Sequence, residues 1–141
     1  MAVPPLESAL LAPVARHFAE QGYSLRAEVP VNGRFADLLA LKGDDLVAVE
    51  LKLTDWRGAL RQAVAYQVGA DRSYVALPLD TAMTVLRRRS AFEEARVGLL
   101  AVHPPDGSVR QLLPADRSAR HLPFQADGLR RLFGAPVGES R

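Results

Sequence analysis

With 141 residues, 48% of them hydrophobic, the chain is long enough for one compact domain with its own core. It has no cysteine, no basic leader followed by an apolar run and no stretch of membrane-spanning length, which excludes disulfide bonds, a thiolate zinc site, a signal peptide and a transmembrane helix. The net charge is only +2, and we expect a cytoplasmic single domain over residues 1–133 without membrane contact, followed by a loose tail at 134–141.

A helix is expected first, over residues 5–21. Its apolar side chains recur at helical spacing and are Leu10, Leu11, Val14 and Phe18. Pro13 falls inside this segment, so it should either kink the helix or mark a later start. Glu7 lies on the apolar stripe, four residues before Leu11, whereas Glu20 points away from it.

Three strands follow in an antiparallel meander. Residues 23–31 alternate in polarity, and Asn32–Gly33 is typical of a two-residue hairpin turn. The next two apolar runs, 35–41 and 46–53, are joined by the turn-forming segment 42–45. Because both odd and even positions of these runs are apolar, we expect strands that are covered on both faces, as at the centre of a sheet.

Three charges interrupt the two apolar runs: Asp37 in the first, and Glu50 and Lys52 in the second. Charges in such places are costly unless they are paired or bound to an ion. Glu50 and Lys52 are two residues apart, so they share one face at about 7 Å, and the hairpin can bring Asp37 beside them. Singly, Asp37 is explained by a strand end and the other two by a solvated cross-strand pair. Together they favour a site.

Two carboxylates and a lysine at one place suit a divalent cation with oxygen ligands. Asp37 and Glu50 would hold Mg²⁺, or Mn²⁺, and the backbone carbonyl of Leu51 would add a third oxygen. Lys52 would help to position or deprotonate an attacking water, or would stabilise charge on a phosphate.

The next helix is expected to begin near Thr54 or Asp55, either of which is a good N-cap. Gln62 and Tyr66 lie one turn apart, on a side of this helix made of small residues, so they should lie close to the sheet and face the cleft. A buried tyrosine bonded to a glutamine within an ordinary core would explain the same pattern.

The remaining expected elements are, in chain order, a strand over 72–78 parallel to its neighbour, a helix capped by Asp80 and running to about Ala95, strands over 97–103 and 108–113 in a hairpin, an irregular segment at 114–123 and a short helix over 125–133. The basic cluster Arg87–Arg89 is explained either as a solvated helix end or as a phosphate clamp. No histidine has metal-ligand spacing.

The pattern of Asp37 followed by Glu50-Leu51-Lys52 resembles the catalytic signature of the PD-(D/E)XK nuclease superfamily, which has the restriction-endonuclease-like fold. The segment from Gln62 to Tyr66 is similar to the Q-x-x-x-Y motif that some branches carry on the following helix. Ala36 stands where the signature has a proline, a position that often varies in the superfamily. The resemblance covers about residues 5–103. It implies an α/β fold in the order αβββαβ, with a mixed sheet of four or five strands flanked by helices, plus an extra helix and a C-terminal hairpin.

The resemblance also implies roles for individual residues. Asp37, Glu50, Lys52 and Gln62 would be catalytic, with Gln62 orienting Lys52 or contacting the nucleic-acid backbone. Several branches carry a carboxylate on the first helix that reaches the metal, and Glu7 matches it here, although an exposed residue in the first helical turn explains Glu7 equally well. We expect the nucleic acid to be contacted by Tyr66, Arg57 and Arg61.

The function expected from these patterns is Mg²⁺-dependent hydrolysis of phosphodiester bonds, with DNA as the expected substrate, although the residue patterns themselves do not distinguish DNA from RNA. The main alternative is a non-cleaving nucleic-acid-binding module in a repair, defence or mobile-element complex, and a structural subunit with paired sheet charges is a third possibility. Only Lys42 and Lys52 of the 18 basic residues are lysines. Such an excess of arginine favours an anionic partner, but a GC-rich genome would produce the same excess. A domain of this size has little surface for specificity, so a homodimer or a separate targeting partner is plausible.

Overall fold

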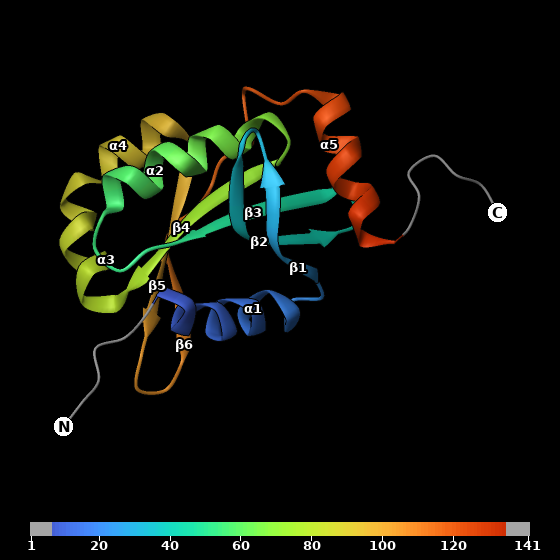
Figure 1. Cartoon of the computed structure of the whole chain (residues 1–141). Helices are drawn as coiled ribbons and strands as arrows, with labels where there is room; N and C mark the ends of the chain where they lie inside the picture. The colour runs from blue at the N-terminus through green and yellow to red at the C-terminus, as the bar shows by residue number, and fades with distance from the viewer. Residues whose placement is uncertain (1–6, 135–141) are drawn as a thin grey trace.

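The computed structural model describes residues 7–134, which form a six-stranded mixed sheet flanked by helices (Figure 1). The strands lie in the order β1-β2-β3-β4-β5-β6, so neighbours in sequence are neighbours in the sheet. The α/β, restriction-endonuclease-like fold class is as predicted, but the sheet is larger than the four or five strands expected, because β6 joins it as an edge strand. The predicted tail lies outside the described residues, except for Gly134.

The first half of the sheet is an antiparallel meander, as predicted, of β1 (Ser24–Val31), β2 (Arg34–Lys42) and β3 (Asp45–Leu51). Val31 pairs with Arg34, which leaves Asn32 and Gly33 as a two-residue turn with positive φ values of 52° and 79°. This backbone twist matches that of the flanking strands, which is why Asn-Gly favours a tight hairpin.

The second half of the sheet is joined to the first by helical crossovers. The elements are α2 (Trp56–Ala65), the short 3₁₀ turn Tyr66–Val68, β4 (Arg72–Pro78), α3 (Leu79–Val85), the 3₁₀ turn Leu86–Arg88, α4 (Arg89–Ala95), β5 (Val97–His103) and β6 (Ser108–Leu113). Strand β4 is parallel to β3 and to β5, whereas β6 returns antiparallel to β5. The predicted bounds of these three strands are confirmed.

Helices cover both faces of the sheet. One face carries α1 (Leu11–Ala19), preceded by the 3₁₀ turn Glu7–Leu10, and the other carries α2, α3 and α4 (Figure 1). Val14 and Phe18 of α1 pack on Val49 and its neighbours. Across the sheet, Ala59 is fully buried, and its small side chain lets the backbone of α2 approach the strands closely.

The structure differs from the predicted bounds or contacts at three places. The α-helix near the N-terminus begins only at Leu11, so Pro13 marks a later start, one of the two outcomes expected for it. It lies in the first turn, where an absent N–H breaks no helical hydrogen bond. The helix predicted over residues 80–95 is broken into α3 and α4, and Asp80 lies in the first turn of α3 without capping it through its side chain. Phe35, at the start of β2, is 65% exposed, so this end of the strand is not covered on both faces.

The C-terminal helix α5 (Pro123–Arg130) and the following 3₁₀ turn Arg131–Phe133 lie beside the first half of the sheet (Figure 1), where Leu129 and Phe133 pack against its strands and one buried carboxylate adds polar contacts. Asp71 accepts a hydrogen bond from the Leu46 backbone N–H at 2.8 Å and one from Arg130 Nη2 at 3.1 Å. His121 Nε2 lies 3.1 Å from its other oxygen. Asp71 therefore joins the start of β3 to α5. None of the helices in residues 7–134 is both long and apolar enough to cross a membrane.

Candidate active site at the open end of the β2–β3 hairpin

The predicted charges lie where strands β2 and β3 separate. Their ladder runs from the pair Lys42–Asp45 to the pair Leu38–Val49 and stops there. In the same register, the next two residues are Asp37 and Glu50. Asp37 Oδ2 accepts a hydrogen bond of 2.7 Å from the backbone N–H of Leu51. The backbone ladder between β2 and β3 has ended here, and the Asp37 side chain takes its place as the hydrogen-bond acceptor for β3.

The backbone of β3 is satisfied on its other side by β4. The Lys52 N–H donates to the Ala76 carbonyl at 3.1 Å, towards β4, whereas the Leu51 N–H points towards Asp37. In an extended strand the N–H and C=O of one residue point to the same neighbour. The Leu51 carbonyl is therefore directed to the side of β3 on which Asp37 lies, as a metal ligand from this residue would require.

Glu50 is a buried carboxylate with a tyrosine as its partner. Its side chain is 5% exposed, and the Tyr66 hydroxyl lies 2.6 Å from Oε1 and 2.8 Å from the Phe35 carbonyl. The pKa of Glu50 is raised to about 7, chiefly by burial; the carboxylates of Asp37 and Glu7 contribute to this rise, whereas the Tyr66 hydrogen bond and Lys52 oppose it. The Tyr66 hydroxyl has a single proton, so it can donate to only one of these two acceptors at a time.

Asp37 is perturbed in the same direction. Burial raises its pKa, and the hydrogen bond from Leu51 opposes this; the carboxylates of Glu7 and Glu28 raise the pKa further, whereas Lys52 lowers it. The pKa values of Asp37 and Glu50 are therefore both raised, chiefly by burial, and the Asp37 carboxylate contributes to the rise at Glu50. Two like charges in a desolvated place are what a bound cation would stabilise.

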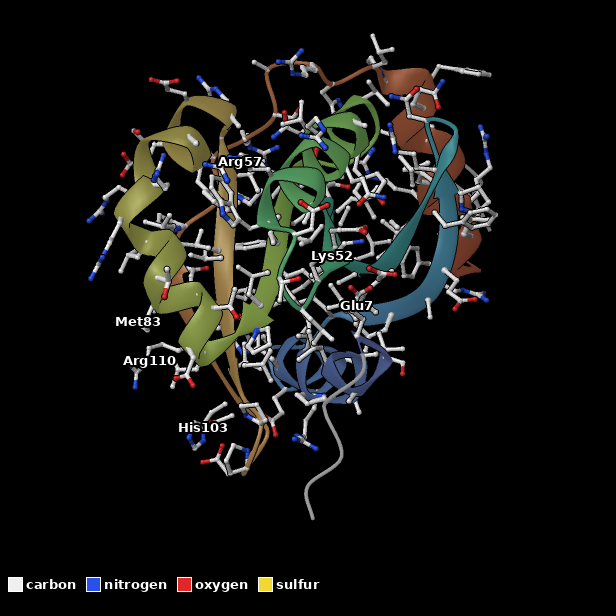
Figure 2. The ribbon with its side chains drawn as sticks, turned by 60° about the vertical axis from the view of Figure 1, so that its left-hand side comes forward. Glu7, Lys52, Arg57, Met83, His103 and Arg110 are labelled. Carbon is white, nitrogen blue, oxygen red and sulfur yellow. The ribbon has the colours of Figure 1, made fainter. Side chains whose placement is uncertain are left out.

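Lys52 provides positive charge at this site. It is half-buried, directly after the end of β3, and its ammonium lowers the pKa of both carboxylates. In Figure 2, Lys52 and Glu7 lie in the same part of the molecule, between the start of α2 and the N-terminal helix. The structure thus brings together Asp37, Glu50 and Lys52, which the sequence had placed on two separate apolar runs.

An acidic pocket of about 230 Å³ adjoins the open end of the hairpin, lined by Glu7, Ser8, Leu11, Glu28, Asp37 and Leu51. Glu7 is exposed, as the plainer explanation has it, and also lines this pocket. Glu28 was missed by the sequence analysis. The Asn32–Gly33 turn contains the signal, because pairing Val31 with Arg34 puts Glu28 opposite Asp37.

The donor atoms fit a hard divalent cation. Carboxylate and carbonyl oxygens are the ligands of Mg²⁺, which keeps several waters and is held by one or two carboxylates. Within residues 7–134, no three acidic or histidine side chains converge closely enough to hold a metal ion by themselves. An ion here would therefore depend on Asp37, Glu50 and the Leu51 carbonyl, with water completing its shell, and Glu7 would act on it from a distance.

The other predicted residues are placed differently from one another. Gln62 is half-buried, and its side chain forms no hydrogen bond with any described residue, so nothing in the structure links it to Lys52. Tyr66 is fully buried at Glu50, where its hydroxyl supports the carboxylate. This replaces the predicted direct contact with nucleic acid. Arg57 and Arg61 are exposed on α2, and the Arg57 guanidinium stacks on Trp56 at 4.3 Å.

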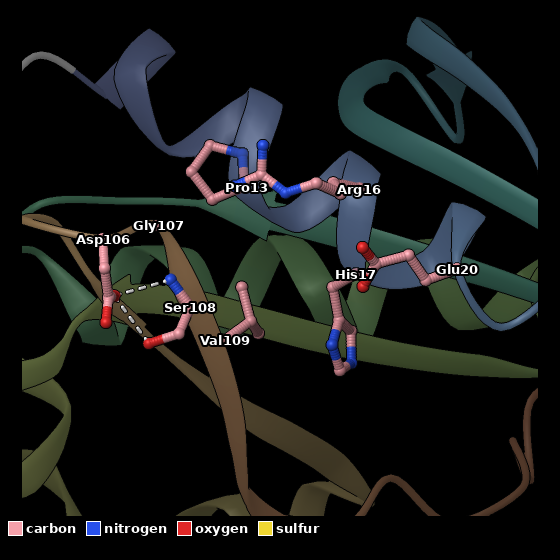
Figure 3. A pocket seen from close by; sticks show the side chains of 8 residues that line it. All are labelled: Pro13, Arg16, His17, Glu20, Asp106, Gly107, Ser108 and Val109. Atoms are coloured by element: carbon pink, nitrogen blue, oxygen red, sulfur yellow. Dashed lines mark hydrogen bonds between the residues drawn. The ribbon is translucent and has the colours of Figure 1, made fainter.

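A second pocket, of about 260 Å³, lies between α1 and the β5–β6 turn (Figure 3). It contains Asp106, whose Oδ1 accepts hydrogen bonds from the backbone N–H and hydroxyl of Ser108 and lies 3.0 Å from His103 Nδ1. These hydrogen bonds, above all those from Ser108, hold the pKa of Asp106 well below its usual range. Ser108 donates to the carboxylate rather than to His103, so this is a turn motif and not a hydrolytic triad.

Comparisons with known proteins identify relatives in fold. No protein-family model matches the sequence, and no curated protein matches it either. The structure is similar to that of an XisH family protein from Nostoc punctiforme, with 20% identity and a TM-score of 0.58 over 74% of this chain and 98% of that chain. It is also similar to an fdxN element excision controlling factor protein from Anabaena variabilis, with 20% identity and a TM-score of 0.47 over 74% of this chain and 97% of that chain. The first similarity shows a shared fold, whereas the TM-score of the second is too low to establish one.

Proposed function

We propose that this protein is a Mg²⁺-dependent nuclease that hydrolyses phosphodiester bonds in DNA. The observation that supports the proposal most strongly is the placement of Asp37 and Glu50 at the open end of the hairpin, where burial and neighbouring carboxylates raise the pKa of both. Such perturbed carboxylates, with a lysine beside them, are typical of catalytic sites and costly anywhere else.

Asp37 and Glu50 would hold the cation, together with the Leu51 carbonyl. A bound divalent ion would supply Lewis-acid polarisation of the scissile phosphate and would lower the pKa of a coordinated water. Asp37 is fixed by its hydrogen bond from Leu51, and Glu50 by the Tyr66 hydroxyl. Both carboxylates are therefore positioned before substrate binds, which reduces the reorganisation needed during the reaction.

Lys52 would act on the phosphate rather than on the ion. Its ammonium is close enough to both carboxylates to lower their pKa values. A cation at this position would stabilise the transition state, in which negative charge develops on the phosphate. Glu50 with a pKa of about 7 would be ionised, and able to bind the ion, in neutral to alkaline solution.

The first experiment incubates the protein with labelled duplex, branched and single-stranded DNA, with Mg²⁺, with Mn²⁺ or with EDTA. Lys52→Ala should abolish cleavage and leave metal binding in place, whereas Asp37→Asn should lose both, because an amide is a poorer ligand for a hard cation. Lys42→Ala is the matched control, since Lys42 is the other lysine and is exposed at the β2–β3 turn. Cleavage that survives in Lys52→Ala would contradict the assignment.

The second experiment measures thermal unfolding with Mg²⁺, Mn²⁺ or Ca²⁺ against EDTA. An ion that binds the folded chain stabilises it by mass action, by about 2.7 kcal/mol at a concentration 100 times the dissociation constant. Asp37→Asn should lose this shift. An identical midpoint in every millimolar ion would count against a metal site.

A non-cleaving nucleic-acid-binding module is the second candidate. One observation favours it: Asp37 and Glu50 each already use one oxygen for a hydrogen bond within the protein, and no third side chain completes a metal cage among the described residues. DNA binding that is unchanged by divalent ions, without cleavage of any DNA form, would support this candidate over the nuclease.

A further inference from the structure

A groove of about 370 Å³ lies beside the start of α2 and is bounded on its other side by α3 and the turn that follows it. It is lined by Thr54, Trp56, Arg57, Thr81, Thr84, Val85, Arg87 and Arg88. Three arginines and three threonines thus line one hollow, and no acidic side chain of the described residues lines it. Charge and hydrogen-bond donors of this kind are complementary to a phosphodiester backbone.

The three arginines of the groove keep their charge free of ion pairs with the described residues. Arg57, Arg87 and Arg88 are exposed, and none of them forms an ion pair with a described residue, whereas the next arginine, Arg89, is paired with Glu93. Arg87 and Arg88 lie in the 3₁₀ turn that breaks the predicted helix. The break brings this basic pair to the groove.

Trp56 holds one of these arginines in place. One face of its indole stacks on Phe92, with ring centroids 5.8 Å apart, and the Arg57 guanidinium lies over the indole at 4.3 Å. A guanidinium fixed in this way keeps its N–H groups available for bidentate contact with phosphate oxygens and loses little side-chain entropy on binding.

The groove is also close to the candidate active site along the chain. Thr54 lines the groove and follows Lys52 by two residues, so their Cα atoms are at most about 8 Å apart. A strand carries one phosphate per 3.4 Å of helical rise, so a strand with its scissile phosphate at Lys52 would present a neighbouring phosphate at the groove.

We propose that this groove binds the phosphodiester backbone of the nucleic-acid strand on one side of the scissile bond, through Arg57, Arg87 and Arg88. The inference rests on the proposed function, because it takes the substrate to be nucleic acid. The contact is to phosphates, so it should not depend on base sequence.

The test measures DNA binding by anisotropy in EDTA, where no cleavage occurs, over a range of salt concentrations, with single-stranded and with duplex DNA. The groove variant is Arg57→Gln/Arg87→Gln/Arg88→Gln. Its control, Arg26→Gln/Arg110→Gln/Arg131→Gln, removes the same charge from exposed arginines elsewhere, and Figure 2 shows Arg110 and Arg57 at separate places on the molecule. Thermal midpoints of both variants verify that they are folded.

The groove variant should bind about tenfold more weakly or worse at moderate salt, and equally so for different sequences. Its slope of log affinity against log salt should fall by about 2–3, which is what three lost phosphate contacts give on single strands or duplex. The control should retain most of the wild-type affinity and slope. Equal losses in both variants, or no binding by the wild type at low salt, would overturn the proposal.

Trp56 gives a second readout, because it is the chain's single tryptophan and lines the groove. DNA binding should change its fluorescence in the wild type and in the control, and not in the groove variant. DNA that binds without changing this emission, or polyglutamate that binds as tightly as DNA, would contradict the assignment. Cleavage with Mg²⁺ is measured separately. Wild-type protein that binds DNA in the groove but does not cleave it would contradict only the nuclease proposal. Cleavage that is undiminished in the groove variant would contradict only the proposed role of the groove.

Discussion

Replacing Glu50 by glutamine should stabilise the fold in alkaline solution, in the absence of divalent ions. Glu50 is 5% exposed, and burial raises its pKa from 4.5 to about 7. The folded chain therefore holds a proton on Glu50 that the unfolded chain has already released between these two values. The resulting penalty is absent below about pH 4.5, grows as the pH rises, and is complete above about pH 7.

The size of the effect follows from the change in pKa. A tenfold difference in proton affinity is worth about 1.4 kcal/mol, so a rise from 4.5 to about 7 corresponds to about 3 kcal/mol at pH 8. Glutamine avoids the buried charge and can still accept the hydrogen bond from Tyr66, but its amide N–H groups need partners, at a cost of about 1–2 kcal/mol. We therefore expect Glu50→Gln to be about 1–2 kcal/mol more stable than the wild type at pH 8, and no more stable at pH 5.

Urea unfolding at pH 5 and at pH 8 in EDTA measures this difference. Glu94→Gln is the control, because Glu94 is exposed on α4 and forms no ion pair with a described residue; its effect should be small at both pH values. Addition of Mg²⁺ at pH 8 should stabilise the wild type and not Glu50→Gln. A stability difference between wild type and Glu50→Gln that is the same at pH 5 and pH 8 would refute the reasoning.

Three further substitutions test parts of the site and of its support. Tyr66→Phe removes the hydrogen bond that lowers the pKa of Glu50, so the Mg²⁺-induced rise in melting temperature should require a higher pH. The variant should also lose about 1 kcal/mol of stability in urea unfolding. An unchanged pH profile of the Mg²⁺ effect would contradict the role given to the hydroxyl. Asp71→Ala should cost about 3–5 kcal/mol in urea unfolding, because it removes the buried carboxylate that accepts from a β3 N–H and pairs with Arg130. Asp127→Ala, which removes a more exposed partner of the same arginine, should cost less than about 1 kcal/mol. Gln62→Ala should be nearly neutral in stability, and a loss of cleavage as large as that of Asp37→Asn would show that Gln62 acts on substrate.

Most strands of this fold follow from local pattern. The segments that became β4, β5 and β6 have the predicted bounds: the first two are short apolar runs bounded by turn residues or helix, and the third is the return arm of a hairpin after a proline- and glycine-containing turn. Helix ends were less predictable. No proline or glycine in the sequence marks the break at Leu86–Arg88. The break depends instead on how α3 and α4 each pack on the sheet. The sequence predicts β6 only as a hairpin arm. It belongs to the sheet because β5 would otherwise be an unpaired edge strand.

The sequence by itself singled out Asp37, Glu50 and Lys52 as the central residues of the candidate site. A single acid in one apolar strand and an E-x-K in the next cannot be accommodated cheaply in a sheet unless they meet, and the meander with its two tight turns requires that they do. Only the tertiary structure decided what surrounds them. Tyr66 comes to Glu50 because the small residues of α2 let that helix lie close to the sheet, and Glu28 comes to Asp37 through strand register. These contacts join residues far apart along the chain, and their energies depend on burial, which no local pattern of residues specifies.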